Sequence, residues 1–202
     1  MKKIFVLFSV IALIAMVSCK DEKSVTSVDP KVIIGEIFKA GMSGYSQAQT
    51  VKSQAVKPQA LKSFSYPINE PVDYTMLGPE GGNIHVTGSI TGSMNFDAIG
   101  NLLPSILLIG LTETISDFAF KFNGQKYTMN GAPYVSATGT FTIQPDRTFG
   151  TASSMQIGGG VRVVGPSYDQ TSNIHITINF NSTGTGGNVS GTFGGEAINY
   201  TS

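Results

Sequence analysis

The chain has 202 residues, with thirteen basic and thirteen acidic side chains and a formal net charge of zero. A neutral chain lacks the positive surface that nucleic-acid binding requires, so no nucleic-acid partner is expected. The single cysteine excludes a disulfide framework, and the 24 glycines favour a domain with many turns and strands.

The first 18 residues have the layout of a secretory signal peptide. Two lysines precede an apolar run over residues 4–17, which is shorter than the ~20 residues that span a bilayer as a helix. The tetrapeptide MVSC at residues 16–19 resembles the lipobox of bacterial lipoproteins, with Met16 in place of the usual leucine. The resemblance implies acyl chains on Cys19 and a membrane partner reached through this lipid anchor. An ordinary cleaved signal or a short N-terminal anchor is the alternative.

The residues that follow the cysteine refine the expected location. The sequence KDEK at residues 20–23 resembles the acidic cluster of surface-exported lipoproteins in some bacteria with two membranes. Lys20 stands where an aspartate would signal retention at the inner membrane. The resemblance implies the outer membrane, with the cell surface as a finer alternative. Alternatively, these charged residues are only the solvent-exposed beginning of a tether over residues 19–29.

A helix is expected directly after the tether. Asp29 and Pro30 form a helix start, with aspartate as the N-cap and proline in the first turn. Apolar residues recur at helical spacing and predict an amphipathic helix over residues 30–45 that covers a sheet. A helix on a membrane surface is the alternative. Residues 46–63, rich in Gln, Ala, Ser and Lys, read as a linker that completes the segment 30–63.

From residue 64 the apolar period changes to two, which predicts a single β domain over residues 64–202. Alternation is strict over residues 84–96, where Gly88 and Gly92 take inward places and indicate a bend or a close approach of another backbone. Further strands are expected at residues 118–122, around 127–129, 135–143, 149–157, 161–164 after a break at three glycines, and 174–180. Tight turns are expected at Asn123-Gly124 and Gly194-Gly195.

Eight or nine sequential strands joined by short turns predict an all-β fold. The expected architecture is an antiparallel meander that forms a strongly curved sheet or half-barrel, with one N-terminal amphipathic helix. Residues 102–111 stand apart because they are apolar on both faces, and Pro104 argues against a central strand at that point. They predict either a strand buried on both sides or an apolar flap that lines a cavity or touches lipid.

No sequence motif for catalysis, metal binding or nucleotide binding occurs in the chain. His85 and His175 are the only histidines, and they could approach each other only if their strands paired in matching register. The acidic residues, Glu113 among them, are expected mostly in turns or on polar strand faces. No catalytic residue, metal site or cofactor is therefore predicted.

An amphipathic helix over a curved sheet resembles the half-barrel lipid carriers of bacterial envelopes. The resemblance implies a non-enzymatic lipoprotein that binds a lipid or another apolar ligand between sheet and helix, with residues 102–111 as a lip. The candidate lining residues are Ile84, Val86, Ile90, Leu107, Ile109, Phe118, Phe120 and Phe141.

That carrier hypothesis predicts a dry cavity, and a fully packed interior would argue against it. The main alternative is a structural or adhesive surface module with a filled core and no ligand. A small outer-membrane barrel and an enzyme with a carboxylate or histidine site are the other two alternatives. No protein partner is predicted.

Overall fold

The structure is a computed structural model that describes residues 28–50, 62–183 and 186–201. The expected signal peptide over residues 1–18, Cys19 and most of the linker lie outside these residues. One helix and nine strands form the described part. Their bounds are α1 Pro30–Thr50, β1 Phe64–Leu77, β2 Asn83–Phe96, β3 Leu102–Ser116, β4 Phe118–Phe122, β5 Gln125–Ile143, β6 Ser154–Gly165, β7 Tyr168–Phe180, β8 Gly187–Phe193 and β9 Glu196–Thr201.

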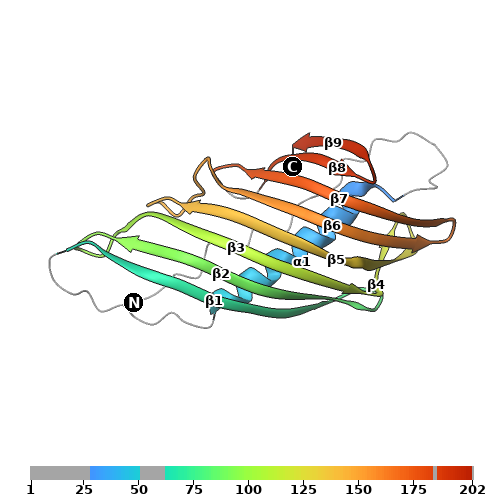
Figure 1. Cartoon of the computed structure of the whole chain (residues 1–202), viewed down its shortest axis with the longest axis horizontal. Helices are drawn as coiled ribbons and strands as arrows, with labels where there is room; N and C mark the ends of the chain where they lie inside the picture. The colour runs from blue at the N-terminus through green and yellow to red at the C-terminus, as the bar shows by residue number, and fades with distance from the viewer. Residues whose placement is uncertain (1–27, 51–61, 184–185, 202) are drawn as a thin grey trace.

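The strands form one antiparallel sheet that is curved and open (Figure 1). Its order is β1-β2-β3-β5-β6-β7-β8-β9, and β4 lies beside β5. The 19-residue β5 pairs with β6 along one edge, and along its other edge its first part pairs with β4 and its second part with β3. The fold therefore confirms the predicted all-β meander with one helix, and β1 and β9 are the two edges of the sheet.

Side-chain alternation decides which face of the sheet is covered. In β7, Ile174, Ile176 and Ile178 are buried, whereas the alternate residues Asn173, His175 and Asn179 are exposed. Because successive side chains of a strand point to opposite faces, this pattern places all the isoleucines on one side. The apolar residues of the other strands follow the same rule and form one buried cluster on that inner face.

Helix α1 lies diagonally across the inner face (Figure 1). It begins as predicted, since Asp29 Oδ1 accepts the Lys31 N–H at 2.9 Å in an N-cap arrangement. The Lys31 ammonium lies 4.8 Å from the ring centroid of Tyr200 on β9, while the other end of the helix packs mainly on β1. The helix ends at Thr50, beyond the predicted boundary, and its apolar face covers the sheet.

Two glycines of β2 allow β3 to approach closely. Gly88 and Gly92 have φ angles of 148° and 138°, which favour glycine over other residues. A Cβ atom at Gly88 would lie 2.0 Å from a backbone oxygen of β3, and one at Gly92 would lie 2.2 Å from another. The close backbone approach expected from the sequence is confirmed at both positions.

One sequence expectation about strand continuity is wrong. The three glycines at residues 158–160 do not interrupt β6, which pairs with β5 and β7 on both sides of them. Residues 102–111 belong to β3, and Pro104 argued correctly against central pairing at its own position: the β2–β3 register shifts between Ser93 and Asn95, and pairing with β5 begins only at Ser105. The Asn95 backbone N–H donates to Ser105 Oγ, and the Asn95 side-chain amide donates to the Pro104 carbonyl oxygen. A bulge of this kind is where a strand tolerates proline.

Candidate functional site

The candidate site is the inner face of the sheet beneath α1. All eight residues predicted to line a ligand site lie there, on four strands, and none is more than 4% exposed: Ile84, Val86, Ile90, Leu107, Ile109, Phe118, Phe120 and Phe141. The alternation in the sequence thus identified the correct face of each strand. The fold brings these residues into one cluster, although they lie up to 57 positions apart in the sequence, from Ile84 to Phe141.

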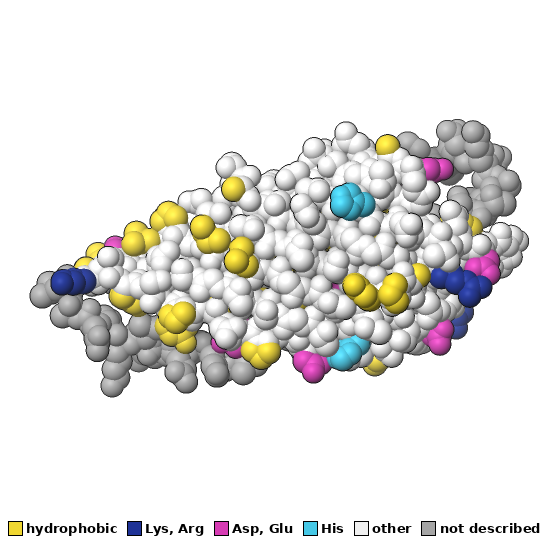
Figure 2. Space-filling model, in the orientation of Figure 1, with side chains coloured by type: hydrophobic (Ala, Val, Ile, Leu, Met, Phe, Trp, Pro, Cys, Tyr) yellow, Lys and Arg dark blue, Asp and Glu magenta, His cyan; other side chains and the backbone are white. Residues whose placement is uncertain are grey.

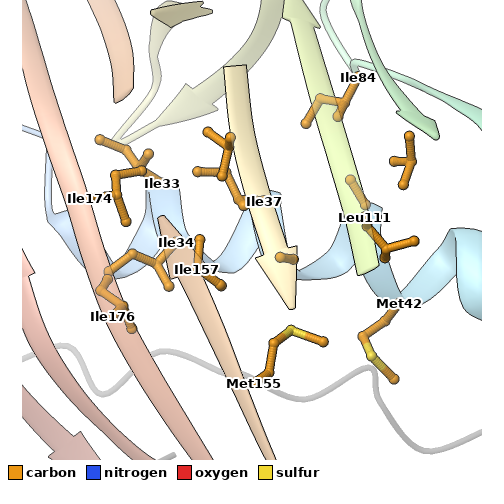
Figure 3. Close-up of a cluster of buried hydrophobic side chains, with 14 of the residues drawn as sticks. Ile33, Ile34, Ile37, Met42, Ile84, Leu111, Met155, Ile157, Ile174 and Ile176 are labelled. Carbon is orange, nitrogen blue, oxygen red and sulfur yellow. The ribbon is translucent and has the colours of Figure 1, made fainter. Parts of the chain in front are cut away.

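The helix supplies the other half of this apolar layer. Ile33, Ile37 and Ala40 are fully buried, and Ile34 is 2% exposed. Figure 3 shows helix side chains facing those of the strands, with Ile33, Ile34 and Ile37 beside residues such as Ile157 and Ile174. In the described part of the chain, strands and helix form one contiguous core. With α1 docked, the eight predicted residues are therefore part of this core and are not open to a ligand.

One polar side chain interrupts this apolar layer. Glu113 on β3 is completely buried, and both of its carboxyl oxygens lack a hydrogen-bond partner in the described structure. Its Oε1 lies beneath Gly41 of α1, so close that a Cβ atom at residue 41 would be 2.9 Å away. The buried hydroxyls of Ser105 and Ser153, by contrast, make hydrogen bonds to backbone groups. Glu113 is thus a buried carboxyl group that the surrounding protein leaves unsatisfied.

Burial raises the pKa of Glu113 from its ordinary value near 4.5 to about 8. The cause is desolvation, which disfavours the charged form of a carboxyl group. The carboxyl is therefore mostly protonated at pH 7, and it can both donate and accept a hydrogen bond.

The expectation that the acidic residues lie mostly in turns or on polar strand faces is wrong for Glu113. A signal was present in the sequence, because Glu113 shares its strand parity with the buried Leu111 and Ile115. The flanking Thr112 and Thr114 masked this signal, since a Thr-Glu-Thr run looks polar throughout.

Residues 102–111 differ from both sequence-based interpretations. Leu107, Ile109 and Leu111 point inward and are buried, but the outward Ile106 and Leu108 are 53% and 49% exposed. Ile106 lies between serine and threonine partners on β2 and β5, and Leu108 lies between two threonines. The segment is therefore a strand with one buried face, and not one buried on both sides.

The outer face is mostly uncharged and polar (Figure 2). His85 on β2 and His175 on β7 both point to it, but β3, β5 and β6 lie between their strands. Four strand spacings separate β2 from β7, or about 19 Å. A paired histidine site is therefore wrong. His85 Nε2 instead lies 2.8 Å from the Asp73 carboxylate on β1.

The described residues contain neither a candidate metal cluster nor a membrane-spanning helix. No group of three or more His, Cys, Asp or Glu side chains in this part of the chain could hold a metal ion. Among the same residues, no helix has the length and apolar character needed to cross a membrane. Comparison of the chain with protein-family models, with curated proteins and with solved structures finds no match.

Proposed function

We propose that the protein is a non-enzymatic lipoprotein of the bacterial envelope that binds an apolar ligand between α1 and the inner face of the sheet. The proposed location is the outer membrane, with an anchor through Cys19. This part of the proposal rests on the lipobox-like residues 16–19 and the charged residues that follow them. The proposed ligand binding is carried by one observation, the unsatisfied carboxyl group of Glu113 under α1.

The buried carboxyl group weakens the docking of α1. An unsatisfied buried polar group costs roughly 1–3 kcal/mol, and a charged one costs more. This cost exists only while α1 covers Glu113, because water can reach the carboxyl group once the helix moves away. A ligand with a hydrogen-bonding end also removes the cost. Glu113 therefore favours the two states that a helix-covered binding protein needs, an open one and a liganded one.

The ligand would take over the apolar contacts of α1. The helix buries Ile33, Ile37 and neighbouring side chains against the sheet, and an acyl or other hydrocarbon chain can cover the same surface. Because the hydrophobic effect is non-directional, exchanging one apolar cover for another changes the free energy little. In this function α1 is a displaceable cover, and the eight inner residues form the floor of the site.

A structural or adhesive surface module is the second candidate, and a different observation favours it. With α1 in place, the described core is one contiguous cluster. The outer face carries rows of Ser, Thr and Asn across neighbouring strands, such as Thr87, Thr112 and Ser136. In this function α1 stays docked and the outer face makes the contacts.

Native mass spectrometry of the full chain, released gently from the membranes of the expressing cells, tests the first candidate. We expect a mass above that of the acylated chain, and we expect the excess to disappear on organic extraction. A clean mass of the acylated chain alone would contradict ligand binding and favour the surface module.

The anchor has a separate test in the same preparation. Cys19→Ser should remove the acyl mass and release the chain from the membrane fraction, whereas Ser18→Ala leaves the cysteine available and should keep both. An acyl mass that survives Cys19→Ser would contradict the assignment of the anchor.

A further inference from the structure

No described basic side chain is buried beside Glu113. Every basic side chain whose burial is described is exposed: Lys31, Lys39, Lys62, Lys121, Lys126, Arg147 and Arg162. One of them, Lys31, lies over the Tyr200 ring on β9, and the acids Glu70 of β1 and Glu36 of α1 are half-buried. The buried part of the inner face around Glu113 therefore offers carboxyl oxygens to a ligand and no cation among the described residues.

The backbone next to Glu113 cannot satisfy it either. Gly41 is the nearest residue of α1, and it lies well inside the helix, which runs from Pro30 to Thr50. An N–H group in the interior of an α-helix is already bonded to the carbonyl four residues earlier. The missing donor must therefore come from outside the described protein groups, once α1 has moved.

We infer that Glu113 is the polar contact of this site, and that the site prefers an apolar molecule with a primary amine at one end over the same molecule with a carboxylate. This inference rests on the proposed function and names the ligand class. An ammonium group brings three donors to the two free carboxyl oxygens of Glu113. A carboxylate would place a second negative group beside Glu113, where no described cation pairs with it.

Proton transfer between the two groups supports this preference. Even with α1 docked, burial raises the pKa of Glu113 only to about 8, which stays below the ordinary pKa of about 10.4 of an alkyl amine. A neutral amine at the site would therefore take the carboxyl proton of Glu113 on its nitrogen. The product is an ammonium–carboxylate pair, which satisfies the carboxyl group directly. An alcohol supplies one donor and no charge, so it is expected to rank between the amine and the carboxylate.

The test compares octylamine, 1-octanol and octanoate, which share one hydrocarbon length. The full chain is held in phosphatidylcholine nanodiscs at pH 7, and hydrogen exchange of the α1 amides reports displacement of the helix at increasing probe concentration. Empty nanodiscs correct for partition of each probe into lipid. We expect octylamine to act at a concentration at least tenfold lower than octanoate, and 1-octanol to fall between them.

A variant of Glu113 and a control variant test whether Glu113 causes the preference for the amine. Glu113→Gln should reduce the difference between amine and carboxylate to less than threefold, whereas Glu196→Gln, at an exposed acid on β9, should leave it unchanged. Equal action of all three probes, or octanoate acting best, would overturn the inference and leave the proposed function standing. Failure of all three to displace α1 would contradict the proposed function as well. If Glu113→Gln does not fold, the three probes on the unmodified chain still decide.

Discussion

Replacement of Glu113 by leucine should remove most of the pH dependence of folding between pH 5 and 8. The carboxyl group has a pKa of about 8 in the folded chain and near 4.5 when it is solvated. Between these values the folded state holds a proton that the unfolded state has lost. The free energy of unfolding therefore falls as pH rises through this window, and it levels off above pH 8.

The pKa difference sets the size of the effect. Each pKa unit corresponds to about 1.4 kcal/mol, so the full window is worth about 5 kcal/mol, of which about 3 kcal/mol is already lost at pH 7. Burial is the only cause identified for the raised pKa of Glu113. The other titratable side chains in or beside the inner-face core are Glu36, Glu70, Tyr74, Tyr127, Tyr168 and Tyr200. Glu113→Leu should accordingly stabilise the chain by about 3 kcal/mol at pH 7, less any strain from repacking.

Urea unfolding of the full chain at pH 5, 6, 7 and 8, followed by far-ultraviolet circular dichroism, measures both quantities. Every other titratable side chain is the same in the parent and the variant, so the difference between the two profiles isolates Glu113. Glu196→Gln serves as the control for an exposed acid. Parallel profiles of the parent chain and Glu113→Leu would refute the reasoning, because they would mean that water or another group already satisfies the carboxyl.

Three further predictions concern α1 and the close approach of β2 to β3. Gly35→Ala, where the new methyl meets open space, should stabilise the chain by about 0.5–1 kcal/mol in thermal unfolding. The matched Gly41→Ala should stabilise it less, because its methyl would lie 2.9 Å from Glu113 Oε1 and the end of that side chain would have to shift; equal effects at the two glycines would contradict this packing. Asp29→Ala should cost about 1 kcal/mol through loss of the N-cap, and Asp29→Asn should restore most of it. Gly88→Ala should lower the yield of folded chain sharply, since its methyl would collide with the β3 backbone, and an unchanged melting temperature would disprove that approach.

Local patterns in the sequence determined much of this protein. Asp29-Pro30 predicted the start of α1, and Asn123-Gly124 predicted a tight turn whose two residues have φ angles of 51° and 77°. Strand alternation predicted the buried face, including all eight candidate residues. These features depend on neighbours only a few residues apart, or on a period that a single strand carries by itself.

The tertiary structure alone decided which strands are neighbours and what lies between them. His85 and His175 share a local sequence pattern, yet three strands of the meander separate them. The glycines at residues 158–160 read as a break, but partners on both sides hold β6 together there. Glu113 is a surface residue or a buried one depending on whether α1 crosses it, and Gly41 of the helix is 72 residues away from Glu113 in the sequence. Burial is a property of what packs against a residue, so the most distinctive group of the site became visible only once the helix lay on the sheet.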